Sequence, residues 1–361
     1  MQIQNNILLA PYTTFKIGGP AKYFGIVKDQ FDALEAYEFA KQNKLPVFVL
    51  GGGSNVLISD TGFNGLVIKI ENKGIEVLTN GVKESEEPEM AESVLLKVAS
   101  GEVWDEVVRF SVQNQWWGME NLSHIPGSTG AIAVQNVGAY GQEAKNLIQS
   151  LIVFNTQTHQ ILEFSQTDCQ FAYRKSIFNT TQKGKFIIFY LTFKLSKIPK
   201  PILEYKDLKQ KFGNSKPSLS EIREAVIDIR NHKYPFPTEP KLGNAGSFFK
   251  NLNLSEEGYL NLKTKIQKLY GTETLNIFEG KVYKENNIYK VPTAFLLEIC
   301  ELKDLEFGGA KINPNQPLVI VNNSGSATAK DVINLANMVI DKVFTHLDTR
   351  LQIEPELVGD F

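Results

Sequence analysis

A short apolar run, Val47 to Leu50, ends directly in the glycine triplet Gly51-Gly52-Gly53. A strand that leads into glycine-x-glycine suggests a dinucleotide-binding fingerprint, and Glu71 falls about twenty residues later, where that fingerprint expects an acid. The third glycine position is Val56, however, and the segment from Ser54 to Gly65 is broken by two glycines and looks like a hairpin. A right-handed crossover needs about ten or more residues and a helix, so we predict that no Rossmann unit is present.

A second glycine-containing turn, Pro126-Gly127-Ser128-Thr129-Gly130, follows the helical pattern of Trp104 to Gln115. Glycines let successive backbone N–H groups point into one concavity, and such a nest binds phosphate without a charged side chain. The sequence lacks glycine-lysine-serine/threonine, so it holds no P-loop. We expect this turn and Gly51-Gly52-Gly53-Ser54-Asn55 to bind the two phosphates of a dinucleotide. The alternative is that each is only a tight turn.

Short strands and helices alternate along the whole chain, which indicates an α+β fold in two halves. Pro199 and Pro201 mark the predicted boundary between a first domain of 1–198, with lobes of about 1–72 and 73–198, and a second of 199–361. The acidic run from Lys83 to Glu89 reads as a solvated hairpin loop. We predict helices at 29–43, 104–115, 219–231, 293–300 and 328–347, and strands at 47–50, 56–59, 66–70, 75–78, 94–100, 150–154, 161–164, 185–195 and 318–322.

Composition excludes several classes of function. A formal net charge of -2 argues against a general nucleic-acid binder. The two cysteines and four histidines have no metal-ligand spacing and no disulfide framework, so we expect no metal site. The N-terminus shows no signal peptide and no apolar stretch is long enough for a membrane span, so a cytoplasmic protein without membrane partners is expected. A monomer is the default expectation.

Seven segments occur in an order and spacing that resemble one known family. They are Thr14 to Gly19, Leu50 to Leu57, Ile125 to Ala131, Gln135 to Gly141, Phe171 to Ser176, Gly243 to Asn251 and Glu354 to Glu356. Together they resemble the UDP-N-acetylenolpyruvoylglucosamine reductases, also called UDP-N-acetylmuramate dehydrogenases, over about Thr14 to Val358. The segment Leu203 to Leu208 resembles the subtype that carries a tyrosine loop over the substrate.

The resemblance implies a two-lobed FAD-binding domain of the vanillyl-alcohol-oxidase (PCMH) type, followed by an α+β substrate-binding domain. NADPH would reduce the flavin, and the reduced flavin would then reduce UDP-N-acetylglucosamine enolpyruvate in peptidoglycan precursor synthesis. We expect FAD to be bound without a covalent link, because the first glycine turn contains no histidine. The expected FAD contacts are Gly51, Gly52, Gly53, Ser54, Asn55, Pro126, Gly127, Ser128, Thr129, Gly130, Gly138 and Tyr140.

Three residues match the family's catalytic positions. The substrate is an enol ether conjugated to a carboxylate, and hydride addition to its methylene carbon develops negative charge beside that carboxylate. Arg174 matches the arginine whose guanidinium holds the carboxylate, and without the match it would read as a surface residue beside Lys175. Ser247 matches the proton donor. Glu356 matches the acid that acts beside Arg174, although a residue so near the end is otherwise expected to be exposed.

For the uridine diphosphate the resemblance implies Tyr205, Lys233 and Asn251, with Gln316 as a weaker candidate. The sequence also departs from the family pattern. Val358 stands where arginine is common, His124 replaces an apolar or small residue, and the loop from Pro235 to Pro240 is longer than usual.

Two other functions remain open from the sequence. One is a different flavin-dependent oxidase or dehydrogenase on the same scaffold, which would share the glycine turns and would not need Ser247 and Glu356. The other is a catalytically silent protein that binds flavin or UDP-sugar.

Overall fold

The computed structural model describes residues 1–78, 92–234 and 242–361. Contacts divide the described chain into two compact units. Residues 199–231, which the sequence placed in the second half, group with the first unit, and the functional boundary after residue 198 stays a prediction. Unit 1 comprises Met1–Ile7, Ala21–Gly52 and Asn64–Asn231, and unit 2 comprises Leu8–Pro20, Gly53–Phe63 and His232–Phe361.

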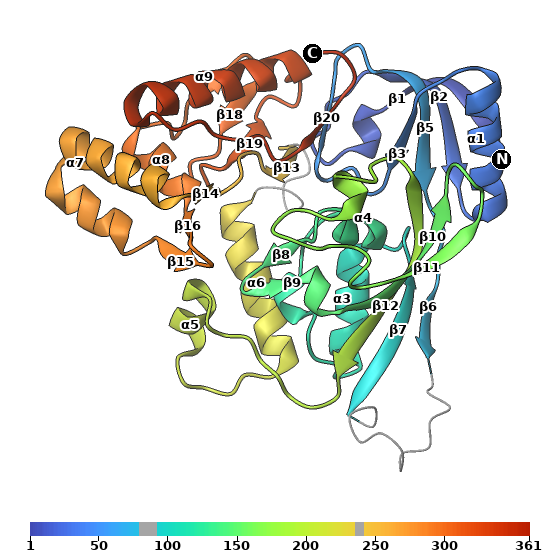
Figure 1. Ribbon diagram of the computed structural model, residues 1–361, viewed down its shortest axis with the longest axis horizontal. Coiled ribbons are helices and arrows are strands. Elements are labelled where there is room, and N and C mark those ends of the chain that lie inside the picture. The colour runs from blue at the N-terminus through green and yellow to red at the C-terminus, as the bar shows by residue number, and fades with distance from the viewer. Residues whose placement is uncertain (79–91, 235–241) are drawn as a thin grey trace. The chain divides into compact units, whose positions relative to one another are not determined.

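The first sheet of unit 1 has the strand order β1-β2-β5-β3 (Figure 1). Helix α1 (Gln30–Gln42) begins at Asp29, whose carboxylate accepts the N–H groups of Phe31 and Asp32 at 2.9 Å. Its buried face consists of small residues that pack with the strands in one apolar cluster, which explains why the predicted helix forms here. The strands are β1 (Ile3–Leu8), β2 (Pro20–Val27), β3 (Val47–Leu50) and β5 (Phe63–Ile70).

The hairpin predicted from Ser54 to Gly65 is wrong. Strand β3 pairs in parallel with β5, whereas β4 (Val56–Ile58) pairs in parallel with β20 (Glu356–Val358). The segment between β3 and β5 is therefore a crossover connection that contains no helix. The sequence argument had excluded any crossover here, because it assumed that a crossover needs a helix. The absence of a Rossmann unit does not depend on that hairpin, since the first glycine turn leads into β4 and not into a helix. A local pattern cannot reveal a strand whose partner lies about three hundred residues away in the chain.

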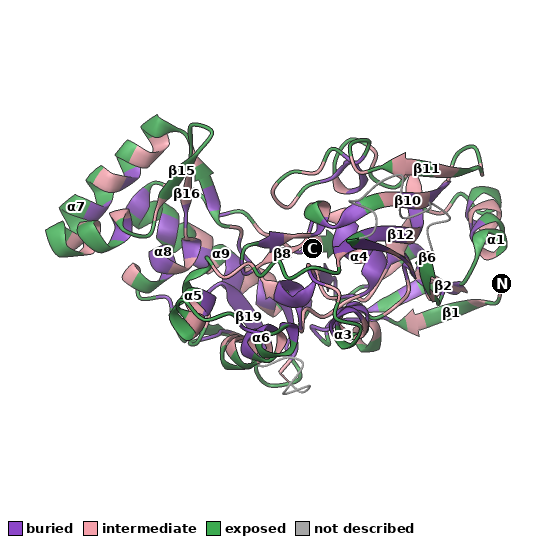
Figure 2. Cartoon of the chain, turned by 90° about the horizontal axis from the view of Figure 1, so that it is seen from below, coloured by how far each residue is buried: buried purple, intermediate pink, exposed green. Residues whose placement is uncertain are grey.

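The second sheet of unit 1 has the order β11-β10-β12-β7-β6, and every neighbouring pair in it is antiparallel. Its strands agree with the predictions to within a few residues, and the acidic run from Lys83 to Glu89 lies outside the described residues. Helices α3 (Trp104–Gln113) and α4 (Thr129–Val134) contribute buried residues to the same core (purple in Figure 2). The strands are β6 (Ile75–Leu78), β7 (Ser93–Ala99), β10 (Ile148–Asn155), β11 (Ile161–Ser165) and β12 (Phe186–Ser196).

Helix α5 (Lys206–Phe212) and helix α6 (Leu219–Lys233), as far as Asn231, complete unit 1. The apolar face of α6, with Leu219, Ile222, Ala225 and Val226, is buried in a small cluster of its own. That cluster also contains Val112 of α3, Trp117 and Tyr140, all of which belong to the sequence around the second glycine turn. Burial of this face accounts for the grouping of residues 199–231 with unit 1.

Unit 2 contains two further sheets, with the orders β13-β19-β18-β17 and β14-β16-β15. Its core is lined by the buried face of α9 (Ala329–Leu347) and by α8 (Thr293–Ile299), two helices that the sequence predicted. None of the helices in the described ranges is long and apolar enough to cross a membrane. The strands are β13 (Asn244–Ser247), β14 (Leu252–Leu254), β15 (Tyr283–Glu285), β16 (Ile288–Val291), β17 (Glu306–Phe307), β18 (Ala310–Ile312) and β19 (Val319–Asn322).

Helix α7 (Glu256–Glu279) was not predicted. Gly271 has φ +81 and interrupts the helix, so neither part shows a long continuous pattern. Leu262, Ile266 and Phe278 are its buried residues, and most of the remaining surface is exposed or half-buried (Figure 2). An apolar face this narrow gives a weak sequence signal.

The start of α9 is capped from a distant part of unit 2. The carboxylate of Asp60, which follows β4, accepts the N–H of Ala329 at 2.7 Å and that of Lys330 at 3.0 Å. Thr328 and Asp331 add a capping box at the same end. Two helix N–H groups are therefore satisfied by a residue about 270 positions earlier in the sequence.

We predict that Asp60→Ala lowers the free energy of unfolding by about 1–2 kcal/mol, because it removes two capping bonds and a charge that complements the helix dipole. Urea unfolding followed by far-UV circular dichroism measures the change. Asp341→Ala, an exposed position on the same helix, is the matched control and should leave stability unchanged. An Asp60→Ala chain as stable as the unaltered protein would show that the cap contributes nothing.

Candidate active site

The two predicted glycine turns touch each other inside unit 1. The N–H of Gly52 donates to Ser128 Oγ at 3.1 Å. A Cβ added at Gly52 would lie 2.4 Å from Gly127 Cα and 2.7 Å from the Ser128 nitrogen, so only glycine permits this approach. The backbone contact brings Gly51 and Gly52 beside Gly127 and Ser128.

The second turn has fewer N–H groups available to bind a phosphate than its sequence suggested. Thr129 donates its N–H to the carbonyl of Glu102 at 2.8 Å, and Gly130 donates to that of Ser100 at 2.9 Å. These two bonds fix the start of α4 on the preceding segment. Gly127 and Ser128 are therefore the candidate N–H donors of this turn, and Pro126, which has no N–H, only shapes it.

In unit 2 the first turn continues through Gly53, Ser54 and Asn55 into β4. Gly53 has φ +64, and a Cβ there would lie 2.1 Å from the Tyr12 carbonyl oxygen. Its own carbonyl accepts the N–H of Thr14 at 3.0 Å. The segment that begins at Thr14 and the first glycine turn, which resemble the family separately, are thus packed together.

Tyr140 and Tyr205, one expected at the cofactor and the other at the substrate, lie together in unit 1. Their rings meet edge to face with centroids 5.3 Å apart. The amide nitrogen of Asn121 donates to the carbonyl of Tyr140 at 2.7 Å and to that of Ile202 at 2.8 Å, and Asn121 is 1% exposed. Asn121, which the sequence did not single out, therefore fastens the start of the tyrosine loop to the segment that holds Tyr140. Tyr205 itself remains 44% exposed just before α5.

Arg174 lies in a tight turn and has φ +54, in the left-handed region. Its Nη2 donates to the carbonyl of Gly138 at 3.2 Å, which joins a predicted catalytic residue to a predicted cofactor contact. Asn136, 1% exposed, holds the turn by donating to the carbonyl of Ala172 at 3.1 Å. A strained backbone kept in place by surrounding bonds is typical of functional positions.

The charge of Arg174 also affects the carboxyl group of Glu143. Burial acts to raise the pKa of Glu143, but hydrogen bonds from Lys145 and Asn136, with the charge of Arg174, outweigh it and hold that pKa below its usual value. Glu143 is therefore ionised at neutral pH.

In unit 2, Ser247 ends strand β13 directly after Gly246, which has φ +72. Ser247 pairs with Val319 across an irregular register, and the next N–H, of Phe248, donates to Leu318. Apart from its chain neighbours, none of the described residues has an atom within 4 Å of a Cβ added at Gly246. Ser247 is half-buried.

Glu356 is not frayed, because it begins strand β20. Its N–H donates to the carbonyl of Asn55 at 3.0 Å, and β20 runs along β4. Just before it, Glu354 donates its N–H to the carbonyl of Phe248 at 2.9 Å. The C-terminal segment therefore passes first along the residue after Ser247 and then along the end of the first glycine turn.

The structure places the remaining predicted contacts at separate points of unit 2. Lys233 is the last residue of α6, and its carbonyl accepts Asn313 Nδ2 at 2.8 Å. Asn251 is exposed, and its Oδ1 accepts the N–H of Thr293 at 3.1 Å, so it also holds the start of α8. Gln316 lies in the turn before β19. The loop from Pro235 to Pro240 lies outside the described residues.

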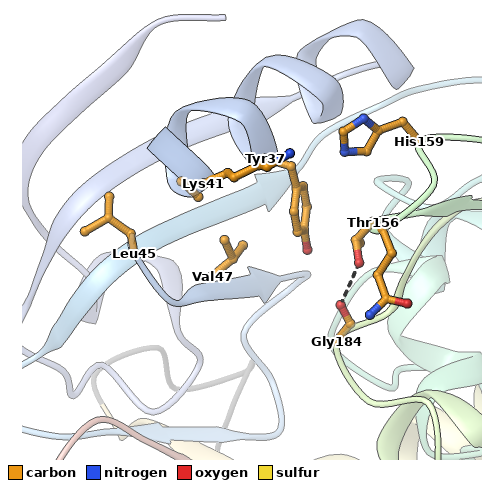
Figure 3. A pocket seen from close by; sticks show the side chains of 9 residues that line it. Tyr37, Lys41, Leu45, Val47, Thr156, His159 and Gly184 are labelled. Atoms are coloured by element: carbon orange, nitrogen blue, oxygen red, sulfur yellow. Dashed lines mark hydrogen bonds between the residues drawn. The ribbon is translucent and has the colours of Figure 1, made fainter. Parts of the chain in front are cut away.

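A cavity of about 430 Å³ occurs elsewhere in unit 1. It is lined by Tyr37, Lys41 and Val47 from one side and by Thr156 and His159 from the other (Figure 3). None of the site residues predicted from the sequence lines it, so it does not enter the candidate active site.

Comparison with known proteins accounts for most of the chain. The profile described as "FAD binding domain" matches residues 21–163, and that of "UDP-N-acetylenolpyruvoylglucosamine reductase, C-terminal domain" matches 237–358. The chain is 35% identical to the UDP-N-acetylenolpyruvoylglucosamine reductase of Flavobacterium johnsoniae, over 99% of this chain and 100% of the relative. It is 35% identical to the enzyme of that name from Neisseria gonorrhoeae, over 96% and 95%.

Among solved structures, the UDP-N-acetylenolpyruvylglucosamine reductase of Thermus caldophilus matches with a TM-score of 0.65 and 22% identity, covering 99% of this chain and 100% of that one. At this identity the likeness concerns the fold. It confirms, together with the two profiles, the predicted α+β architecture of an FAD-binding portion and a C-terminal domain.

We predict that Gly52→Ala weakens FAD binding about tenfold to a hundredfold, because the added methyl group forces the two glycine turns apart and overpacking costs about 1–3 kcal/mol. Quenching of flavin fluorescence on titration of the apo-chain measures the dissociation constant. Gly258→Ala serves as control, since a Cβ there makes only ordinary contacts. Unchanged FAD affinity in Gly52→Ala would remove the diphosphate from this contact.

Proposed function

The chain belongs to the UDP-N-acetylenolpyruvoylglucosamine reductase family, and we propose that it reduces UDP-N-acetylglucosamine enolpyruvate to UDP-N-acetylmuramate. It is a flavin-dependent oxidoreductase with FAD as cofactor. The observation that carries the proposal is the identity of 35% across 99% of this chain and the full length of the relative. We further propose that NADPH supplies the reducing equivalents and that the enzyme is a cytoplasmic monomer.

The residues of unit 1 fit the cofactor by their backbone. The Gly52–Gly127 approach leaves no room for side chains, and the N–H groups of Gly127 and Ser128 are suitable donors for a diphosphate. FAD, when bound, supplies the hydride that adds to the methylene carbon of the substrate. We propose that the chain binds it without a covalent link.

The chain's own residues bind, orient and protonate the substrate. Arg174 binds the carboxylate of the enolpyruvyl group, and its guanidinium hydrogen bonds strengthen as charge develops on the adjacent carbon. Ser247 Oγ–H donates a proton to that carbon. A hydroxyl is a weak acid, so this donor is effective only against the strongly basic carbon that the addition creates. By its match to the family's acid, we propose that Glu356 polarises the same carboxylate.

The nucleotide end of the substrate is bound by a separate set of residues. We propose that Tyr205, Lys233 and Asn251 contact the uridine diphosphate, with Gln316 as a weaker candidate for the nucleotide. The contact of Tyr205 with Tyr140 and the Asn121 bonds at Ile202 support an ordered tyrosine loop. The binding energy of this distant group is available to orient the enolpyruvyl group.

The test follows the flavin spectrum of the purified, FAD-loaded protein without oxygen. NADPH should bleach the absorbance, and UDP-N-acetylglucosamine enolpyruvate should restore it with formation of UDP-N-acetylmuramate. UDP-N-acetylglucosamine, which lacks the enolpyruvyl group, is the control and should restore nothing. Recovery of colour only with oxygen would favour a flavin-dependent oxidase, and a protein that takes up no FAD would overturn the assignment.

We predict that Ser247→Ala slows reoxidation of the reduced flavin by the substrate about 10²- to 10⁴-fold, because a positioned proton donor contributes a factor of that order. Reduction by NADPH should proceed at the unaltered rate, since no proton from Ser247 enters that half-reaction. Anaerobic stopped-flow absorbance measures the two rates separately. Equal slowing of both half-reactions would contradict the role of proton donor.

A further inference from the structure

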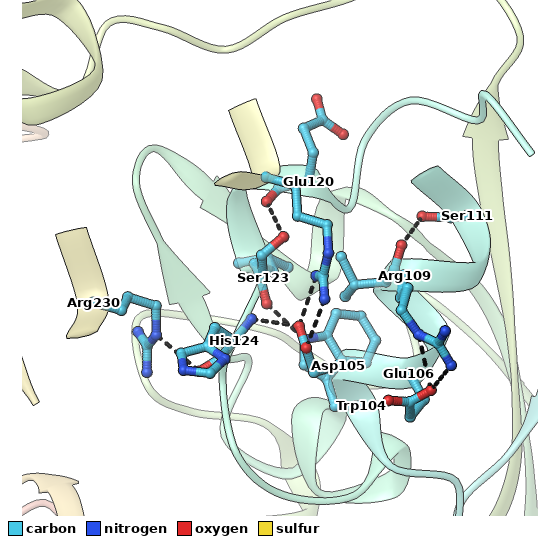
Figure 4. A network of polar contacts seen from close by, with 12 residues as sticks. Trp104, Asp105, Glu106, Arg109, Ser111, Glu120, Ser123, His124 and Arg230 are labelled. Carbon is cyan, nitrogen blue, oxygen red and sulfur yellow. Dashed lines mark hydrogen bonds and ion pairs between the residues drawn. The ribbon is translucent and has the colours of Figure 1, made fainter. Parts of the chain in front are cut away.

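His124, the residue that leads into the second glycine turn, is held at its N–H, its C=O and its ring, and Figure 4 shows it between Asp105 and Arg230. Asp105, the second residue of α3, accepts the backbone N–H of His124. Arg230 Nε donates to the His124 carbonyl at 2.9 Å, and His124 Nε2 lies 2.9 Å from Asn231 Oδ1. His124 has φ +60, a conformation that residues with a side chain adopt at an energetic cost. These bonds keep it there.

Asp105 is itself fixed by Arg223 of α6. The guanidinium forms two parallel hydrogen bonds with the carboxylate, at 2.8 and 2.7 Å. The Asp105 side chain is 23% exposed and that of Arg223 is 12% exposed, so water competes little for the hydrogen bonds between them. Burial acts to raise the pKa of Asp105, but the bonds from Arg223 and from the His124 N–H outweigh it and hold that pKa below its usual value. The acceptor is therefore ionised at neutral pH, and the bonds that it makes are charge-assisted.

The same helix end holds the turn at a second point. Trp104, which precedes Asp105, donates its backbone N–H to the carbonyl of Gly127 at 3.1 Å. The first residues of α3 thus form hydrogen bonds with both ends of the segment from His124 to Gly127. Because Gly127 is in direct backbone contact with Gly52, a shift of this segment would move the second glycine turn away from the first.

We propose that Asp105 and Arg223 are positioning residues for the FAD diphosphate, an inference that rests on the proposed flavin site. The pair fixes the backbone of His124 and so sets the spacing of the two glycine turns. Helix α6 thereby contributes to FAD binding although it lies beyond residue 163, where the match to the FAD-binding profile ends.

A purely structural role predicts something different. If the pair only attached α6 to unit 1, its loss would lower the stability of the chain and leave the FAD affinity of the folded protein unchanged. A positioning role changes that affinity in the folded protein. The two roles are separated by measuring both quantities on the same variants.

The experiment measures FAD dissociation constants by flavin fluorescence for Asp105→Ala, Arg223→Ala and the double variant, with urea unfolding of each apo-chain alongside. Each single change should weaken FAD binding about tenfold to a hundredfold, since bonds to charged groups are lost. The double variant should have the same FAD dissociation constant as the single variant that binds FAD more weakly, because either change already breaks the pair. Asp105→Asn retains an acceptor for the His124 N–H and should fall between Asp105→Ala and the unaltered protein.

Arg109→Ala is the matched control. Arg109 also lies on α3 and pairs with an acid, Glu106, but on an exposed face (Figure 4), and its loss should leave FAD affinity unchanged. Folded Asp105→Ala and Arg223→Ala chains that bind FAD as tightly as Arg109→Ala overturn the proposal. If the alanine variants do not fold, Asp105→Asn and Arg223→Lys carry the same comparison. Failure of the flavin site itself is recognised separately, because the unaltered protein and Arg109→Ala would then also bind no FAD.

Discussion

The backbone contact between Gly52 and the Gly127–Ser128 segment is the constraint on which the proposed cofactor site depends. It requires glycine at position 52, because a Cβ there would collide with the backbone of Gly127 and Ser128, and it requires each turn to arrive at a defined position. The first turn is placed by the parallel pairing of β3 with β5, since Leu50, the last residue of β3, is followed at once by Gly51. The second is placed by the first residues of α3, which hold the segment from His124 to Gly127. A phosphate site made of backbone N–H groups has no charged side chain to compensate for misplacement, so its strength depends on this spacing.

In unit 2 the comparable constraint is long-range strand pairing near the chain's end. Strand β20 is the parallel partner of β4, and Val358, at its end, is 4% exposed and pairs with Ile58. This gives a physical reason for an apolar residue where the family commonly has arginine, because the side chain is buried within unit 2. The bond from Glu354 to Phe248 fixes the same segment beside Ser247. Glu356 is therefore held by a strand that begins at its own position.

Local sequence patterns predicted the regular elements well where a broad apolar face or a clear cap was present. Helix α9, with its capping box at Thr328, and helix α1, with Asp29, begin where the sequence indicated. The errors occurred where the deciding partner was distant. The false hairpin after Gly53 and the unpredicted Asp60 cap both depend on residues hundreds of positions away. Helix α7 was missed for another reason, the interruption at Gly271 and a narrow buried face.

For the site, the motifs indicated the residues but not the bonds that hold them. Asn121 carries no chemical signal of its own in the sequence, yet its amide joins the carbonyls of Tyr140 and Ile202. The motifs also suggested more phosphate donors than the fold provides, because the N–H groups of Thr129 and Gly130 are used within the backbone. Several non-glycine residues here, among them His124, Tyr140 and Arg174, have positive φ angles. Each conformation carries a cost that specific neighbours offset, such as Asp105 for His124. A site held this way is arranged before ligands arrive, and less reorganisation then remains for the reaction to drive.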